Sequence, residues 1–308
     1  MGRKAGMKAK KPSDKFTIAF LVLWLMMLAC SSLLPAAATD IPDPTGSIVY
    51  SSDESGNFEI YHMNIRSLET VRLTDNSSFD TFPFYLPPAR FGFAADRSGK
   101  YQVYTMDMDG ANQKAWKKGD RRILFTPSVS PDGKKMAYVV QNNDENSNLY
   151  LADLDGNQEE QLTDIRGMEW DPSWSPDGTR IVFSSDVGGD FEINVIDLES
   201  SQITKLTDNA FYDGRPRWSP DGDQILFESD QDGDWELYTM DIDGGNVRAI
   251  TENATGDWLA NWSPDGHWIV YVSNHDGDDE IYIIGVDGKD QWKLTNNTAQ
   301  DQYPAWVP

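Results

Sequence analysis

Acidic residues recur at one fixed place in this 308-residue sequence, five positions before a landmark residue that is mostly aromatic. The set consists of Asp80, Glu169, Asp213, Asp257 and Asp301, and its last four members follow one another every 44 residues. Two interpretations stay open. Each carboxylate could accept hydrogen bonds from backbone N–H groups where a strand begins. Alternatively, the five could converge, with pKa values raised by mutual repulsion, and bind a cation or a basic peptide.

Aromatic side chains accompany this acidic set. Trp170, Tyr212 and Trp258 lie next to or near its members and would flank a binding site there. A second set of acids falls in polar loops, at Asp53, Asp96, Asp186, Asp230 and Asp276. One such loop, 230–236, is rich in oxygen ligands, but its Gly stands fourth, whereas an EF-hand loop needs Gly sixth. We therefore expect no cofactor, and calcium in these loops is the alternative.

Other reactive side chains are few. The chain has one Cys and three His, which excludes an intrachain disulfide and makes a structural zinc site hard to build. The sequence contains no recognisable nucleophile or metal motif. It is strongly acidic, with 50 acidic and 26 basic side chains and a net charge of −24. Because such a surface repels phosphate groups, we expect no nucleic-acid partner and favour cations or basic surfaces.

A repeat positions the acidic set. The tetrapeptide Ser-Pro-Asp-Gly occurs at 130–133, 175–178, 219–222 and 263–266. The landmark residue precedes each Ser, and its six occurrences are 44 or 45 residues apart: Tyr85, Val129, Trp174, Trp218, Trp262 and Trp306. A fixed period of this length is typical of a repeat architecture.

Each repeat predicts four short strands. In the fifth repeat a strand ends at Trp262, and the Pro and Gly of 263–266 favour a tight turn. Aromatic and β-branched residues indicate three further strands, at 267–273, 280–286 and 291–295. Four strands in 44 residues, without a helical period, are typical of a β-propeller blade.

The two ends of the repeated region complement each other. Residues 47–52 match a second strand that lacks a first strand, whereas 303–306 match a first strand with nothing after it. The sequence therefore predicts an all-β, six-bladed β-propeller over 47–308, closed by N-terminal and C-terminal strand pairing in the first blade. The loops between second and third strands and the loops that cross to the next blade share one face, here called the loop face. The acidic set would lie there, at the mouth of the central channel.

Several motifs resemble the WD40-like (PD40) repeats of the TolB propeller family. They are P-x-W-S-P-D-G, the run Y-T-M-D-I-D-G at 238–244, and L-T-D-N at 73–76 and 206–209. The resemblance covers 47–308 and implies the propeller fold. It does not imply TolB itself, which carries an α/β domain ahead of its propeller that residues 39–46 are too few to supply. Similar propellers accompany prolyl oligopeptidase-like hydrolases, but this sequence has no G-x-S-x-G motif.

The N-terminal region is typical of an export signal, expected over 1–38 and followed by a linker at 39–46. Its first 15 residues are rich in Lys and Arg, and the next 14 are uncharged and apolar, which is short for a transmembrane span. Two processing sites stay open: lipid attachment at Cys30, within a lipobox-like Met-Leu-Ala-Cys, or cleavage after Ala38. A retained anchor is a third reading. All three place the propeller outside the cytoplasm, with membrane contact only through the signal or a lipid.

These observations favour an exported, non-catalytic propeller with a monomeric body that binds a protein or a basic peptide on its acidic loop face. An alternative of a different class is a propeller that binds or cleaves carbohydrate with carboxylates and aromatic side chains at the channel mouth. Carboxyl groups roughly 5–10 Å apart in an accessible pocket would support that alternative.

Overall fold

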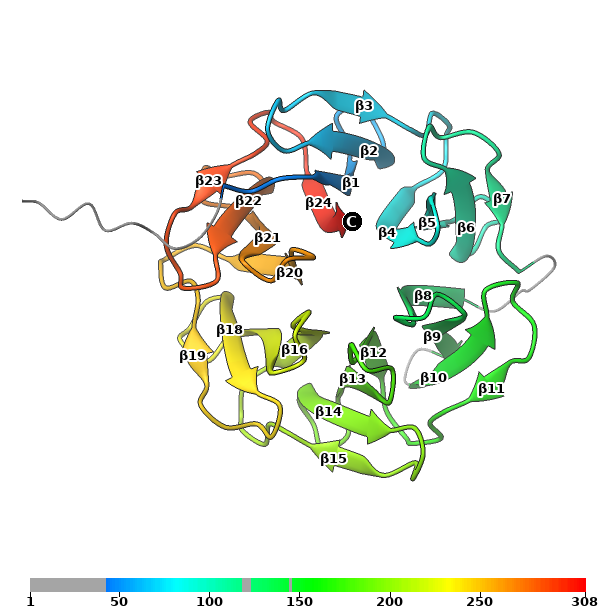
Figure 1. The fold of residues 1–308 in the computed structure, drawn as a ribbon, viewed down its shortest axis with the longest axis vertical. Coiled ribbons are helices and arrows are strands. Elements are labelled where there is room, and N and C mark those ends of the chain that lie inside the picture. Colours follow the sequence, from blue (N-terminus) through cyan, green and yellow to red (C-terminus); the bar gives the residue numbers. More distant parts are fainter. Residues whose placement is uncertain (1–42, 118–122, 144–145) are drawn as a thin grey trace, which may run out of the picture. The chain divides into compact units, whose positions relative to one another are not determined.

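The computed structural model describes residues 43–117, 123–143 and 146–308. The described strands form six four-stranded antiparallel sheets, arranged as blades around a central axis (Figure 1). This arrangement confirms the all-β, six-bladed propeller. The expected export signal and Cys30 lie outside the described residues. In the described part of the chain, no helix has the length and apolar character needed to cross a membrane.

Within each blade, the strands run from the axis outward in the following order. Blade 1 contains β24 (Asp301–Val307), β1 (Ser47–Ser52), β2 (Glu59–Asn64) and β3 (Thr70–Arg72); blade 2 contains β4 (Asp80–Leu86), β5 (Arg90–Ala95), β6 (Gln102–Asp107) and β7 (Lys114–Ala115). Blade 3 contains β8 (Ile123–Val129), β9 (Lys135–Asn143), β10 (Asn146–Asp153) and β11 (Glu160–Gln161); blade 4 contains β12 (Glu169–Trp174), β13 (Arg180–Ser185), β14 (Glu192–Asp197) and β15 (Ile203–Lys205). Blade 5 contains β16 (Asp213–Trp218), β17 (Gln224–Ser229), β18 (Glu236–Asp241) and β19 (Arg248–Ala249); blade 6 contains β20 (Asp257–Trp262), β21 (Trp268–Ser273), β22 (Glu280–Gly285) and β23 (Trp292–Lys293).

The two ends of the repeated region close the ring, as the sequence predicts. Strand β24 pairs antiparallel with β1, with Trp306 opposite Ile48 and Ala305 opposite Val49. Strand β1 pairs on its other side with β2. The fourth strand of blade 6 is shorter than expected, since only Trp292–Lys293 pair there. An outermost strand has a neighbour on one side only, so fewer contacts hold its ends.

The Ser-Pro-Asp-Gly turns join first and second strands through local hydrogen bonds. In the turn at 175–178, Ser175 Oγ donates to Asp177 Oδ1 (2.6 Å) and accepts from the N–H of Arg180 (2.9 Å). Gly178 has φ 72°, a left-handed conformation that glycine adopts without strain. The hydrogen bond from Ser175, with those from Thr179, lowers the pKa of Asp177 to about 2. The turn thus depends on an ionised Asp.

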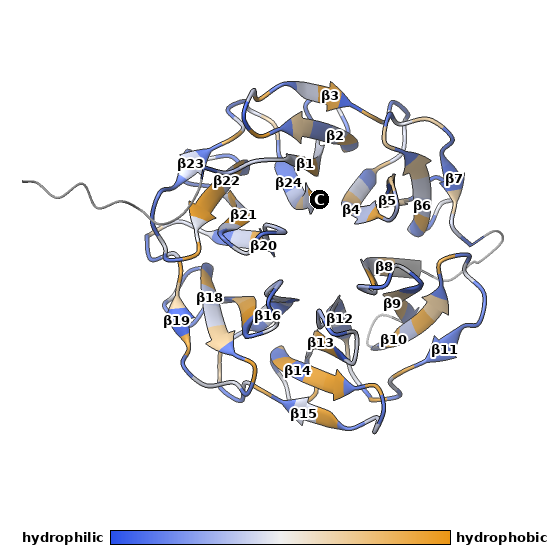
Figure 2. Cartoon of the chain, in the orientation of Figure 1, coloured by the Kyte–Doolittle hydropathy of each residue, from blue (hydrophilic) through white to orange (hydrophobic). Residues whose placement is uncertain are grey.

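The hydrophobic core lies between neighbouring blades. One cluster joins Val49 and Ile60 of blade 1 to Phe91 and Phe93 of blade 2, all fully buried. Figure 2 shows hydrophobic residues gathered on the strands and hydrophilic residues in the connecting loops. The landmark Trp174 belongs to the same kind of packing, because its indole N–H donates to the carbonyl of Ser128 in the preceding blade (3.1 Å). Ring closure therefore buries both faces of every blade.

Candidate functional site

The acids of the sequence-based set begin the innermost strands of their blades, and their side chains are buried. Asp80, Glu169, Asp257 and Asp301 are 0% exposed, and Asp213 is 2% exposed. This burial differs from the second of the two sequence-based interpretations, in which the carboxylates converge at an open channel mouth. The physical reason is that each acid lies beneath the loop that crosses from the preceding blade, and polar groups of that loop cover it.

A four-residue polar network surrounds four of these five acids, and blades 5 and 6 show it clearly. The side-chain amide of Asn253 donates to Asp257 Oδ2 (2.8 Å), and its backbone N–H donates to Glu236 Oε1 (2.5 Å). Thr251 Oγ1 accepts the N–H of Leu237 (3.0 Å). We call this set of Glu, Thr, Asn and acid the interblade clasp, because its first three members belong to one blade and the acid begins the next.

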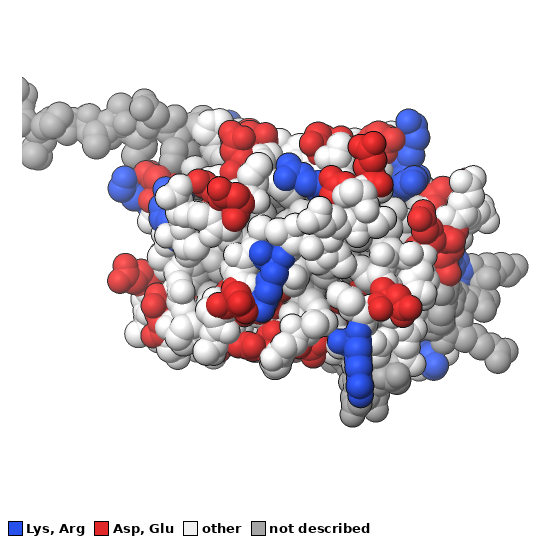
Figure 3. All heavy atoms as spheres, turned by 90° about the horizontal axis from the view of Figure 1, so that it is seen from below, with Lys and Arg blue, Asp and Glu red and all other residues white. Residues whose placement is uncertain are grey.

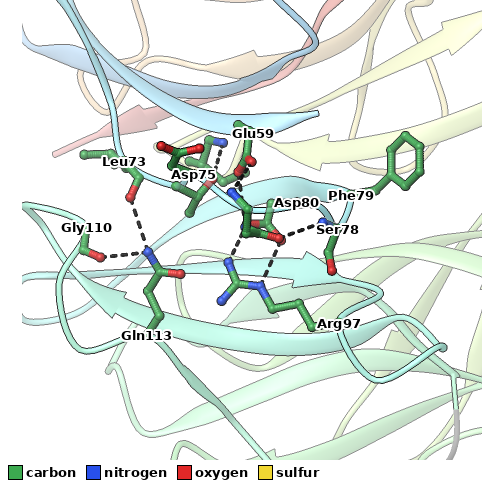
Figure 4. A network of polar contacts seen from close by, with 12 residues as sticks. Glu59, Leu73, Asp75, Ser78, Phe79, Asp80, Arg97, Gly110 and Gln113 are labelled. Atoms are coloured by element: carbon green, nitrogen blue, oxygen red, sulfur yellow. Dashed lines mark hydrogen bonds and ion pairs between the residues drawn. The ribbon is translucent and has the colours of Figure 1, made fainter. Parts of the chain in front are cut away.

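The interblade clasp recurs around the ring, with Asn-to-acid hydrogen bonds of 2.7–2.8 Å. Its other complete copies are Glu59, Thr74, Asn76 and Asp80; Glu192, Thr207, Asn209 and Asp213; and Glu280, Thr295, Asn297 and Asp301. Between blades 3 and 4, Glu169 instead accepts from Thr163 and from the N–H of Leu149. Figure 4 shows the clasp of blades 1 and 2, where Arg97 Nε also donates to Asp80 Oδ1 (3.1 Å).

Burial raises the pKa of several clasp acids, because a buried carboxylate loses its hydration. The pKa of Glu169 and that of Glu236 rise to about 7, and that of Asp301 rises to about 6. The charge of Asp257 raises the pKa of Glu236 further. Among the described residues, one buried oxygen of Glu236 and one of Asp257 accept no hydrogen bond. A proton retained on such a pair relieves the repulsion between two buried charges.

The acids of the hairpin loops perform the capping that one sequence interpretation gave to the other set. Asp96 Oδ1 accepts the N–H of Phe79 (2.9 Å), and Asp230 Oδ1 accepts the N–H of Tyr212 (2.9 Å). Asp186 and Asp53 accept the N–H groups of Met168 and Gln300 in the same way. In blade 6 Asn274 takes this place, with Gly256 as donor (3.0 Å), and Asp276 pairs with Lys293 (2.6 Å). In the described part of the chain, no group of three or more His, Cys, Asp or Glu could hold a metal ion.

The exposed charge of the loop face comes from other acids. The residue after each of the five buried Thr residues of the crossing loops is exposed, and it is an acid in four places and Asn296 in the fifth; the acids are Asp75, Asp164, Asp208 and Glu252. The side chains of Asp75 and Asp208 are 87% and 86% exposed, and each pairs with a basic neighbour, Asp75 with Arg72 and Asp208 with Lys205 (2.6 Å). Figure 3 shows acidic side chains spread over the side of the ring, with fewer Lys and Arg among them. These exposed acids precede the members of the predicted set by five positions.

Aromatic side chains contact one another near the starts of the innermost strands. The ring of Trp170 lies 5.2 Å from that of Phe125, measured between centroids. Tyr212 contacts Phe191 (5.2 Å) and Trp235 (4.7 Å). Two further loop-face rings are largely open to solvent, namely Phe79 (46% exposed) and Phe211 (43%). The third predicted aromatic residue, Trp258, is half-buried and covers Gly256, where an added Cβ would come within 2.3 Å of the indole.

The central channel contains a second candidate site. The innermost strand of every blade shifts register by a β-bulge, and the bulged residue has a positive φ of 41–57°. These six residues are Phe82, Thr126, Asp171, Arg215, Leu259 and Tyr303. All of them line one cavity of about 440 Å³, whose walls come from all six innermost strands and which therefore lies on the axis. A repeated backbone feature thus presents six different side chains.

The cavity has a charged side and an aromatic side. Arg215 Nη1 pairs with Glu228 Oε2 (2.9 Å), and the Asp171 carboxylate lies 3.9 Å from Arg215 Nε and 4.0 Å from Arg217 Nη2. Burial opposes the charge of both arginines. The neighbouring carboxylates nevertheless raise the pKa of Arg215, whereas burial leaves the pKa of Arg217 lowered. On the aromatic side, the rings of Phe82 and Tyr303 lie 3.9 Å apart.

Sequence reasoning missed the bulged residues and the partners of the clasp acids. The clasp could have been found, because Glu, Thr and Asn recur with the same period of 44 residues as the acids. The bulge leaves a weaker signal. Its residue stands between the acid and the repeated Pro and has a different type in each blade.

Comparisons with known proteins agree with this architecture. A family model described as the TolB beta propeller domain matches residues 100–308. An uncharacterized protein of Agrobacterium fabrum is 32% identical over 148 residues, which cover 44% of this chain and 50% of that protein. The Tol-Pal system protein TolB of Alcanivorax borkumensis is 30% identical over 84 residues, 27% of this chain and 19% of that protein. The chain thus spans half or less of these curated relatives.

Among solved structures, TolB from Acinetobacter baumannii superposes with a TM-score of 0.76 at 21% identity, over 97% of this chain and 74% of that one. A putative TolB from Agrobacterium tumefaciens gives a TM-score of 0.69 at 21% identity, over 86% of this chain and 99% of that one. Oligogalacturonate lyase in complex with manganese gives 0.58 at 15% identity, over 80% of this chain and 73% of that one. At these identities the similarity establishes the fold alone.

Proposed function

This chain belongs to the family of TolB beta propeller domains, and from that premise we propose that it is a non-catalytic protein that binds a protein partner on its loop face. The partner presents basic side chains and an apolar residue. The proposal includes a location outside the cytoplasm, which is supported by the basic and apolar segments before residue 30. No cofactor is needed for this function.

One observation carries the proposal: two of the loops that cross between blades each carry an exposed aromatic ring and an exposed acid. Phe211 follows Asp208 in the loop that crosses from blade 4 to blade 5, and Phe79 follows Asp75 in the loop from blade 1 to blade 2. Interfaces commonly combine an aromatic anchor with a charged rim that steers the partner. The buried clasp acids do not reach such a partner, but they fix the loops that carry these exposed residues.

The carbohydrate alternative has weaker support. Glycoside cleavage usually requires two carboxyl groups that flank the bond. Among the described residues that line the axial cavity, Asp171 supplies one carboxylate, and Glu228 is 1% exposed and paired with Arg215. The similarity to oligogalacturonate lyase rests on the fold.

Site-specific cross-linking tests the proposal. A photoreactive residue placed at Phe211 in the full chain, expressed in its native cell, should form one dominant adduct with another protein. The same residue placed at the exposed Asn246, in the turn between β18 and β19, is the matched control and should form little of that adduct. Equal adducts at both positions, or none at Phe211, would contradict binding through the loop face.

A further inference from the structure

The axial cavity gathers two guanidinium groups and two carboxylates, but it does not pair them equally. Its lining includes the guanidinium groups of Arg215 and Arg217 and the carboxylate of Asp171. Glu228, buried to 1% exposure, pairs with Arg215 at 2.9 Å. Arg217 is left with Asp171 at 4.0 Å, the outer limit of an ion pair. The charge of Arg217 is therefore the one that this site compensates least.

Neutral groups hold the Arg217 guanidinium in place. Nε donates to Asn261 Oδ1 (3.1 Å), and Nη1 donates to the carbonyls of Pro216 (2.9 Å) and Asp171 (3.4 Å). Asn261 is fixed in turn, because its amide donates to the carbonyl of Pro304 (2.9 Å). Among the described residues, Nη2 has only the distant Asp171 carboxylate. A guanidinium held in this way, with its Nη2 group still able to donate, suits a carboxylate oxygen.

The lowered pKa of Arg217 agrees with this geometry. Burial opposes its charge more strongly than Asp171 and Glu228 support it. An anion that entered the cavity would supply the missing countercharge. The other side of the cavity is apolar and aromatic, with Phe82 and Tyr303 in contact at a centroid distance of 3.9 Å.

We propose that the axial cavity binds a small carboxylate carried on an apolar or aromatic body. Arg217 pairs with the carboxylate, and Phe82 and Tyr303 contact the body. A volume of about 440 Å³ lies within the range of small-molecule sites. The carboxylate belongs either to a free small molecule or to the C-terminus of a peptide. This site is separate from the loop face, and neither proposal depends on the other.

Binding of defined probes tests the proposal. Calorimetry and tryptophan fluorescence are suitable readouts, since Trp174, Trp218, Trp262 and Trp306 line the cavity. We expect 3-phenylpropanoate to bind at least tenfold more tightly than 3-phenylpropanamide or 3-phenylpropylamine, because a hydrogen bond to a charged group is worth about this factor. An acetylated peptide ending in Phe, compared with its C-terminal amide, distinguishes the peptide source from the small molecule. Equal affinity for acid and amide, or no binding of any acid probe, would overturn the proposal.

Substitutions in the axial cavity test whether the probe binds there. Arg217→Gln should weaken 3-phenylpropanoate about tenfold or more, and Asp171→Asn should tighten it, because a competing carboxylate is removed. Arg66→Gln, on an exposed turn, is the matched control and should change nothing. If Arg217→Gln does not fold, the direction of the Asp171→Asn effect decides. Unchanged binding in both cavity variants would contradict the site. Phe211→Ser should leave probe affinity unaltered, so failure of the loop-face proposal would remain distinguishable.

Discussion

Asn253 joins two neighbouring blades, because its side-chain amide donates a 2.8 Å hydrogen bond to the buried Asp257. Its backbone N–H donates to Glu236 in its own blade. The carboxylate that looks, in the sequence, available to a partner is therefore a structural element of the boundary between blades 5 and 6.

Removal of the clasp amide should destabilise the ring. Asn253→Ala leaves a buried carboxylate oxygen of Asp257 without its donor, and we expect the free energy of unfolding to fall by about 1–3 kcal/mol. Urea denaturation measures the change. Asn296→Ala, which removes an exposed side chain whose Oδ1 accepts from Lys293 Nζ (3.0 Å), should cost less than about 0.5 kcal/mol. Equal costs for the two variants would argue against a structural role for the clasp.

Acidification should stabilise the propeller at mildly acidic pH. The pKa of Glu169 and that of Glu236 rise to about 7, and that of Asp301 to about 6, from ordinary values of 4.5 and 3.8. The folded state thus binds protons that the unfolded state releases. Stability from these groups is fully present below about pH 4 and is lost as pH rises through 6 to 7. The melting temperature should therefore be higher at pH 5.5 than at pH 7.5.

A single substitution tests the source of this pH dependence. Glu236→Gln keeps the shape of the side chain but removes a titrating group, so the difference in melting temperature between pH 5.5 and 7.5 should shrink. Glu199→Gln changes an exposed acid and should leave the difference intact. The pKa values of the Asp residues in the Ser-Pro-Asp-Gly turns are lowered. These residues therefore change the stability of the protein only at lower pH. A wild-type protein that is most stable at pH 7.5 would contradict the raised pKa values.

Closure of the ring should depend on the last strand. Trp306 is 7% exposed and its residue pairs with Ile48 of β1, so Trp306→Ala should cost about 3–5 kcal/mol of stability. Trp292, in the outermost strand of blade 6, is 44% exposed, and Trp292→Ala should cost clearly less. Thermal unfolding followed by circular dichroism makes the comparison. A Trp306→Ala variant as stable as Trp292→Ala would speak against closure through β24.

The fold could be predicted from the sequence because its repeated residues set the backbone conformation of the turns and pack between neighbouring blades. The Gly of each Ser-Pro-Asp-Gly turn supplies a positive φ, and landmark residues such as Trp174 pack between blades. The complementary ends, residues 47–52 and 303–306, then require closure.

The candidate site could be predicted only in part. Residue type alone places acids at the surface, and nothing in Asp257 itself shows that Thr251, Asn253 and Glu236 surround it. The residues proposed to bind a ligand in the axial cavity, such as Arg217 and Tyr303, stand at positions whose residue type differs between repeats. A comparison of the repeats finds the residues that they share and therefore does not identify these positions.

Titration with a Lys-rich peptide tests most directly whether the exposed acids or the buried acids bind a basic partner. We compare a variant with Asp75→Asn, Asp208→Asn and Glu252→Gln against the single variant Asp257→Asn. We expect the exposed triple variant to lose most of the affinity seen with the wild-type protein, while Asp257→Asn retains it. Retained affinity in the triple variant, together with loss in Asp257→Asn, would contradict the account.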